Sequence, residues 1–113
     1  MATSTQLNKI TDEISINAHK VLGDRLHKII LYGSYARGDY DSESDIDIMV
    51  LADVNTAELP KLKDKICQIS SDVSLDNDIT VSVFLKDRAF FDSHINILPF
   101  YKNIVSEGIL IYG

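Results

Sequence analysis

The sequence predicts one α/β domain (α+β in kind) over residues 1–113, with helices flanking a small mixed β-sheet. Apolar residues recur at helical spacing in several stretches, and short runs rich in Ile, Leu and Val separate these stretches. The two patterns alternate along the chain, which is typical of a sheet with helices packed on it. No internal repeat and no linker rich in Gly, Ser or Pro divides the chain.

Composition indicates a folded protein and limits the possible partners. The chain is 45% hydrophobic and 25% charged, close to ordinary globular usage. Its formal net charge of -6 lacks the basic footprint of proteins that bind duplex DNA, so we expect no direct binding to duplex DNA. We expect a cytoplasmic protein without a membrane partner, because the chain has a lone Cys67, no signal-peptide pattern and no long apolar run.

The first expected element is a helix from Ser4 to Asp24. Ser4 or Thr5 can cap its start, and Gly23 suits its end. One apolar stripe runs along it, at Leu7, Ile10, Ile14, Ala18, Val21 and Leu22.

Two strands follow, on either side of a polar turn. The run "LHKIILYG" predicts a strand that stops at Gly33, and "DIDIMVL" predicts a second one over residues 45–51. Between them, a helical turn can start at Tyr35.

The remaining elements follow from the same two periodicities. Helical spacing predicts a helix from Thr56 to Val73, and "DITVSVFL" predicts a third strand over residues 78–85. Residues 86–107 indicate two helical pieces broken at Pro99, and "ILIY" indicates a short last strand.

Asp45 and Asp47 are candidate metal ligands. Side chains alternate along a strand, so these two carboxylates share one face while Ile46 and Ile48 point the other way. Like charges at that separation repel unless a cation lies between them. Mg²⁺ prefers oxygen ligands and is commonly held by one or two carboxylates plus substrate phosphates.

Gly33 and Ser34, at the end of the preceding strand, are candidate phosphate ligands. Glycine lets backbone N–H groups approach a ligand closely, and the serine hydroxyl adds a donor. Arg37 suits a phosphate contact or a surface salt bridge equally well. The sequence thus places a phosphate pocket opposite a metal pocket.

These residues carry a resemblance to a known family. "GSYARGDYDSESDID" resembles the signature of the nucleotidyltransferase superfamily that includes DNA polymerase beta: G-S, ten residues, then D-x-D. Gly33, Ser34, Asp45 and Asp47 occupy the motif positions. The chain length and the ending "PFYKNIVSEGILIYG" are similar to the minimal nucleotidyltransferases, single catalytic domains found in prokaryotes beside a HEPN-domain partner.

The resemblance implies an enzyme of the nucleotidyltransferase fold. It implies transfer of AMP from ATP, with two Mg²⁺ ions, to a tyrosine of a HEPN toxin that the chain silences as an antitoxin. Because 113 residues leave no room for an acceptor domain, we expect a partner chain or an oligomer to complete the site. The alternative is a nucleotide-binding module with weak catalysis that neutralises its partner by contact alone.

The family's third metal-binding carboxylate is expected on a later strand. Asp78 is the candidate, since Asp78, Thr80 and Ser82 share one parity of the expected third strand. If the family position instead aligns with Ser82, the third ligand is missing.

Overall fold

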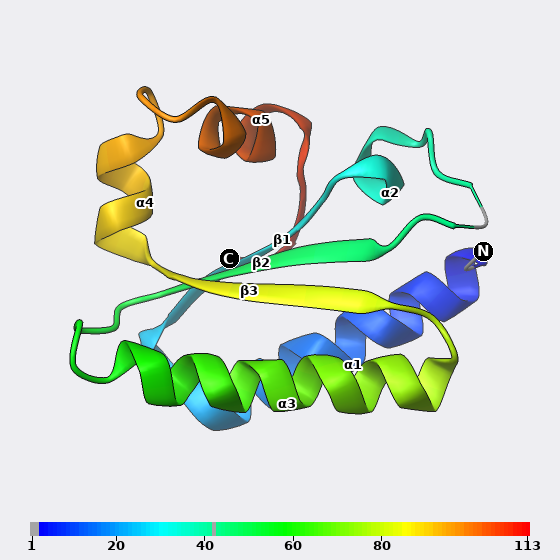
Figure 1. The fold of residues 1–113 in the computed structure, drawn as a ribbon, viewed down its shortest axis with the longest axis horizontal. Coiled ribbons are helices and arrows are strands. Elements are labelled where there is room, and N and C mark those ends of the chain that lie inside the picture. The colour runs from blue at the N-terminus through cyan, green and yellow to red at the C-terminus, as the bar shows by residue number, and fades with distance from the viewer. Residues whose placement is uncertain (1–2, 42) are drawn as a thin grey trace.

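A four-stranded mixed sheet lies between two helical layers in the computed structural model, which describes residues 3–41 and 43–113 (Figure 1). The strand order is β3-β2-β1-β4. The central β1 is antiparallel to β2 and to β4, and β3 is parallel to β2. The strands span Leu26–Tyr32 (β1), Ile46–Ala52 (β2), Val81–Asp87 (β3) and Ile109–Tyr112 (β4). The predicted fold class is confirmed.

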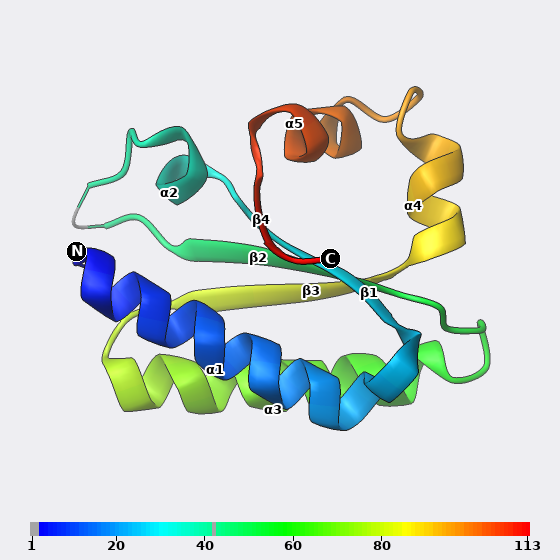
Figure 2. The same ribbon diagram turned by 180° about the vertical axis from the view of Figure 1, so that it is seen from behind.

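Two long helices, α1 (Ser4–Leu22) and α3 (Leu59–Asn77), run side by side across one face of the sheet (Figure 2). They bury the larger core, which includes Ile10, Ile14, Ile29, Ile48, Val50, Ile66, Val83 and Leu85. A short 3₁₀ turn, η1 (Gly23–Arg25), joins α1 to β1. Gly23 ends α1 as predicted.

The N-terminal cap of α1 is Thr3, so the expectation of Ser4 or Thr5 was wrong. The extended backbone of Thr3 lets its hydroxyl accept a hydrogen bond from the N–H of Gln6 at 3.1 Å. This satisfies one of the free N–H groups in the first turn of the helix.

The opposite face of the sheet carries two shorter helices, α4 (Arg88–His94) and α5 (Pro99–Glu107). They cover a second cluster of buried residues, formed by Ile30, Tyr32, Met49, Leu51, Phe91, Tyr101 and Ile104. The predicted break between the two helices is confirmed, because Leu98 before the proline is extended (φ -97°, ψ 115°). A one-turn helix, α2 (Ser34–Arg37), follows β1.

The third helix and third strand differ from their predicted bounds. Helix α3 continues to Asn77, whose buried amide donates to the carbonyl of Val73 at 2.8 Å. Asp78 then takes the left-handed conformation (φ 52°) that ends the helix, so β3 begins only at Val81. Asp78 therefore does not lie on the third strand. Across the described residues, no helix combines the length and apolar character needed to cross a membrane.

Candidate active site

A cleft of about 350 Å³ opens where β1 and β2 meet α2 and α5. In Figure 1 these two helices stand above the sheet. The cleft is lined by Tyr32, Gly33, Ser34, Arg37, Asp47, Phe100, Asn103, Ile104 and Glu107. Four residues singled out from the sequence, Gly33, Ser34, Arg37 and Asp47, thus come together in one place.

The position of the Asp47 carboxylate depends on Gly33. Tyr32 pairs with Asp47 in the antiparallel register of β1 and β2, so the residue after Tyr32 lies directly beside that carboxylate. Gly33 has φ 75°, a conformation that favours glycine. A Cβ atom at residue 33 would lie 2.5 Å from Oδ2 of Asp47. The glycine therefore makes room for the carboxylate against the backbone.

The electrostatics of Asp47 suit a cation. Burial raises the pKa of the Asp47 carboxyl, and the negative charge of Asp45 raises it further. Arg37 acts in the opposite direction and lowers that pKa. A bound cation would offset the repulsion between the two carboxylates, whose oxygens are ligands of the kind that Mg²⁺ prefers.

Tyr32 places a phenol in the same cleft. Burial, assisted by the charge of Asp47, raises the pKa of Tyr32 to about 12. The hydroxyl therefore stays protonated at neutral pH and can donate a hydrogen bond. Its ring packs edge-on against Phe100 with the ring centroids 5.7 Å apart.

Arg37 forms two ion pairs at the rim of the cleft. Its Nε lies 3.2 Å from Oδ2 of Asp39, and its Nη1 lies 3.6 Å from Oε2 of Glu107. The side chain remains 44% exposed, so it can reach an anion in the cleft. Both interpretations of Arg37, a surface salt bridge and a phosphate contact, are compatible with this position.

Asp45 and Asp78 lie at a neighbouring polar cleft of about 320 Å³, together with Gln6, Glu43, Ser44, Ile79 and Thr80. Asp45 is close enough to Asp47 to raise its pKa, but Asp78 has no such effect. Within residues 3–41 and 43–113, no three His, Cys, Asp or Glu side chains form a group that could hold a metal ion. The structure therefore does not assemble Asp45, Asp47 and Asp78 into one three-carboxylate site.

Ser82 occupies the position across from Asp47. In the parallel register of β2 and β3, Asp47 pairs with Ser82, and paired residues point to the same face of a sheet. A later strand thus presents a hydroxyl beside Asp47.

Several cleft residues were not singled out from the sequence. Phe100, Asn103, Ile104 and Glu107 all come from α5, more than 50 residues after Asp47. These four residues recur at helical spacing, which identifies one face of a helix. The spacing contains no information about which strand end that face covers.

Comparison with known proteins identifies the family. A family model described as a nucleotidyltransferase domain matches residues 16–111. The chain belongs to this nucleotidyltransferase family. Gly33, Ser34, Asp45 and Asp47, the residues singled out from the sequence motif, all lie within the matched range.

Two curated relatives of this nucleotidyltransferase, both from Methanocaldococcus jannaschii, are named putative protein adenylyltransferases. One is 38% identical over 98 residues, which are 85% of this chain and 95% of the relative. The other is 35% identical over 88 residues, which are 78% of this chain and 80% of the relative. The family and these relatives together identify the chain as a nucleotidyltransferase enzyme.

Solved structures show the same fold. A toxin-antitoxin crystal structure with AMP-PNP aligns with a TM-score of 0.57 and 20% identity, covering 91% of this nucleotidyltransferase and 73% of that chain. A structure of a tri-AMPylated Shewanella oneidensis HEPN toxin with its MNT antitoxin aligns with a TM-score of 0.54 and 17% identity. The alignment covers 94% of this nucleotidyltransferase and 71% of that chain.

Proposed function

We propose that this nucleotidyltransferase transfers AMP from ATP to a tyrosine hydroxyl of a HEPN toxin and thereby acts as its antitoxin. The observation that carries the proposal is the cleft in which Ser34 and Arg37 face the Asp47 carboxylate. The names of the M. jannaschii relatives support protein adenylylation. The AMPylated HEPN toxin in one structural neighbour supports the class of acceptor.

Asp45 and Asp47 are the proposed ligands of Mg²⁺, with two ions as expected from the family resemblance. The donor atoms are carboxylate oxygens, and after burial the charge of Asp45 raises the pKa of Asp47, so a cation held between the two carboxylates would offset their repulsion. Bound Mg²⁺ supplies Lewis acidity that lowers the pKa of an attacking hydroxyl and stabilises a leaving pyrophosphate. Asp78 lies outside the pair, so the geometry lends no support to its expected role as a third ligand.

In the proposed reaction, the tyrosine oxygen of the acceptor forms a bond to the α-phosphorus of ATP. The bond from that phosphorus to the oxygen bridging the β-phosphate breaks, pyrophosphate leaves, and the phenolic proton passes to water. The Ser34 hydroxyl donates to a phosphate oxygen, and the Arg37 guanidinium balances triphosphate charge. Gly33 keeps the backbone close to the Asp47 carboxylate, which orients that ligand.

The decisive experiment is label transfer to the purified product of the neighbouring gene, tested as the acceptor toxin. With [α-³²P]ATP and Mg²⁺ we expect label on a tyrosine of that protein, and with [γ-³²P]ATP we expect none. Asp47→Asn should reduce transfer at least about 100-fold, since loss of supporting residues at metal sites already costs 10–100-fold. Asp53→Asn, at the other end of β2, is the matched control and should transfer normally. Equal transfer by both variants would refute the assignment.

Ser82 favours one second candidate, a module that neutralises its partner by contact alone. A serine stands across from Asp47 on β3, and the described residues hold no three-carboxylate group. The double variant Asp45→Asn, Asp47→Asn separates the two functions. Loss of toxin neutralisation supports catalysis, and full neutralisation supports contact alone.

A further inference from the structure

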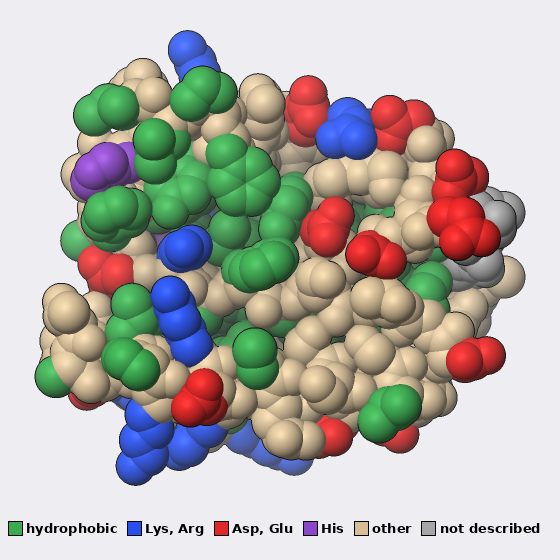
Figure 3. Space-filling view, in the orientation of Figure 1, with side chains coloured by type: hydrophobic (Ala, Val, Ile, Leu, Met, Phe, Trp, Pro, Cys, Tyr) green, Lys and Arg blue, Asp and Glu red, His purple; other side chains and the backbone are tan. Residues whose placement is uncertain are grey.

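A group of exposed apolar side chains lies beside the catalytic cleft, over β3, α4 and α5. We call Phe84, Phe90, Ile97, Leu98 and Phe100 the aromatic face. Phe84 and Phe90 are each 48% exposed, and Phe100 is 51% exposed. Figure 3 shows apolar side chains gathered over this part of the molecule. Large exposed apolar groups of this kind mark interaction sites.

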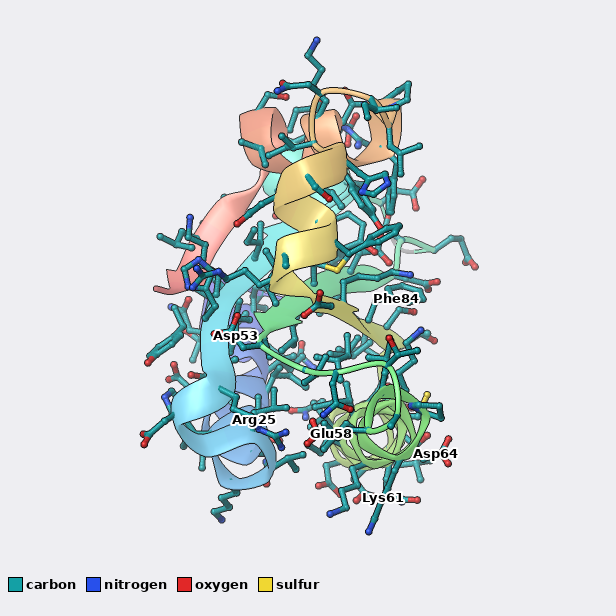
Figure 4. All side chains as sticks on the ribbon, turned by 90° about the vertical axis from the view of Figure 1, so that its left-hand side faces the viewer. Arg25, Asp53, Glu58, Lys61, Asp64 and Phe84 are labelled. Atoms are coloured by element: carbon teal, nitrogen blue, oxygen red, sulfur yellow. The ribbon has the colours of Figure 1, made fainter. Side chains whose placement is uncertain are left out.

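Phe84 belongs to this face because of strand parity. Val83 and Leu85 of β3 point into the core beneath α1 and α3, so Phe84 points to the opposite side of the sheet. Figure 4 labels Phe84 on β3, above α3. The strand is at the edge of the sheet, where a partner can approach.

The aromatic face is continuous with the catalytic cleft. Phe100 lines that cleft and contacts Tyr32. The ring of Tyr101 then connects Phe100, at a centroid distance of 6.0 Å, with Phe90 at 6.4 Å. A molecule bound on this face would therefore reach the proposed reaction centre.

At its far end, the aromatic face meets a second cleft of about 260 Å³. Phe90 forms one wall, and the other lining residues are Val54, Thr56, Leu59, Lys63, Lys86 and Asp87. The Asp87 carboxylate already accepts hydrogen bonds from the N–H groups of Val54 at 3.3 Å and Phe90 at 3.2 Å.

The two lysines of this second cleft outnumber its one carboxylate, that of Asp87. Among the ion pairs of the described residues, none involves Lys63 or Lys86. They are positive groups on a chain whose net charge is -6. An apolar side chain flanked by a carboxylate would fill the cleft and pair with these ammonium groups.

We propose that the aromatic face and the second cleft form the docking surface for the acceptor protein, which presents an apolar segment flanked by acidic side chains. This proposal rests on the proposed function, because the acceptor must present its hydroxyl at the catalytic cleft. Because the net charge of the chain is -6, positive groups at this surface also orient an acidic partner toward it.

A second copy of this chain fits the surface less well. In a symmetric dimer the same patch lies on both sides of the interface, so Lys63 and Lys86 of both copies would be gathered there with only the two Asp87 carboxylates. Like charges at an interface are unfavourable. The charge pattern therefore favours a different protein with acidic groups.

Titration calorimetry with the purified product of the neighbouring gene tests the surface directly. Lys63→Glu, Lys86→Glu should weaken binding about tenfold or more, since reversing both charges introduces repulsion. The matched control is Lys61→Glu, Lys65→Glu, which makes the same charge change on exposed positions of α3; Figure 4 shows Lys61 on the side of α3 away from the sheet. The control should bind like the original protein.

A second pair of variants tests the apolar part. Phe84→Ser, Phe90→Ser should weaken binding by a similar factor, whereas Ile16→Ser, Leu75→Ser, which removes exposed apolar side chains on α1 and α3, should not. Thermal unfolding verifies that each variant is folded. In label transfer, the two surface variants should raise the KM for the acceptor and leave Mg·ATP affinity unchanged.

The outcomes separate the two proposals. Normal binding by both surface variants, no binding by the original protein, or a dimer of this chain that these substitutions dissociate would each overturn the docking surface. Absence of label transfer despite binding that depends on this surface would overturn the proposed function and retain the docking surface.

Discussion

The backbone of Gly33 and the carboxylate of Asp47 lie so close that a Cβ atom at residue 33 would be 2.5 Å from Oδ2 of Asp47. Gly33→Ala should therefore displace the proposed metal ligand as well as strain the backbone at φ 75°. We expect a loss of about 1–3 kcal/mol in the free energy of unfolding from the backbone alone, because φ 75° with ψ -155° is a region essentially restricted to glycine. Label transfer should fall at least about tenfold.

Gly23→Ala is the control for this substitution. Gly23 also has a positive φ, of 57°, but nothing lies within 4 Å of a Cβ atom there. It should lose a similar unfolding free energy in urea titrations and retain transfer at a temperature where both variants are folded. If Gly33→Ala transfers label as well as Gly23→Ala does, the close approach has no catalytic importance.

Asp47→Asn should stabilise the protein at neutral pH when no metal is bound. Burial and the charge of Asp45 raise the pKa of Asp47 above its ordinary value of 3.8, so the folded state disfavours the ionised carboxylate. This penalty is full above the raised pKa of the folded state. It disappears as the pH falls through that pKa to below 3.8.

Urea unfolding in EDTA at a series of pH values measures this effect. The advantage of Asp47→Asn over the original protein should be greatest near pH 7 and shrink in acid. Asp53→Asn should show little pH-dependent change, since the Asp53 side chain is 60% exposed. A less stable Asp47→Asn protein at pH 7 would mean that the carboxylate stabilises the fold without a cation.

Arg37→Gln should weaken Mg·ATP binding about tenfold or more, because a charged hydrogen bond to phosphate contributes about 1.5–3 kcal/mol. The loss should be smaller at high salt, since the side chain is partly exposed. Equilibrium binding of ATP at two salt concentrations measures both effects. Arg25→Gln removes an arginine that pairs with Glu58 at the opposite end of β1, as Figure 4 shows, and should bind normally. Unchanged affinity in Arg37→Gln would limit Arg37 to its ion pairs with Asp39 and Glu107.

Ser82→Asp should place a third carboxylate beside Asp47 through the parallel register of β2 and β3. Without metal, the added like charge should lower the melting temperature. With Mg²⁺, the increase in melting temperature should be larger than in the original protein, because tighter ligand binding stabilises the folded state more. Ser71→Asp, exposed on α3, adds the same charge away from the cleft and should show neither effect. An unaltered response to Mg²⁺ would place Ser82 outside the metal site.

Local patterns in the sequence predicted most elements, because each helix or strand depends on side-chain spacing within a few turns. The α1 stripe, the β1 and β2 runs and the break before Pro99 agree with the structure. Predictions failed where a capping contact decided the bounds. Thr3 caps α1 with a hydroxyl that no periodicity reveals. Asp78 ends α3 in a left-handed conformation.

The sequence by itself determined the family and the central motif, since Gly33, Ser34, Asp45 and Asp47 lie within 15 consecutive residues and their spacing is read directly. Only the tertiary structure showed that α5 closes the cleft with Phe100 and Glu107, and that Ser82 stands across from Asp47. The tertiary structure also brought Phe90, Lys63 and Lys86 together in one cleft. The order of the strands and the docking of the helices decide these contacts, because the arrangement buries apolar surface from all parts of the chain. Local spacing of residues does not encode which distant segments meet.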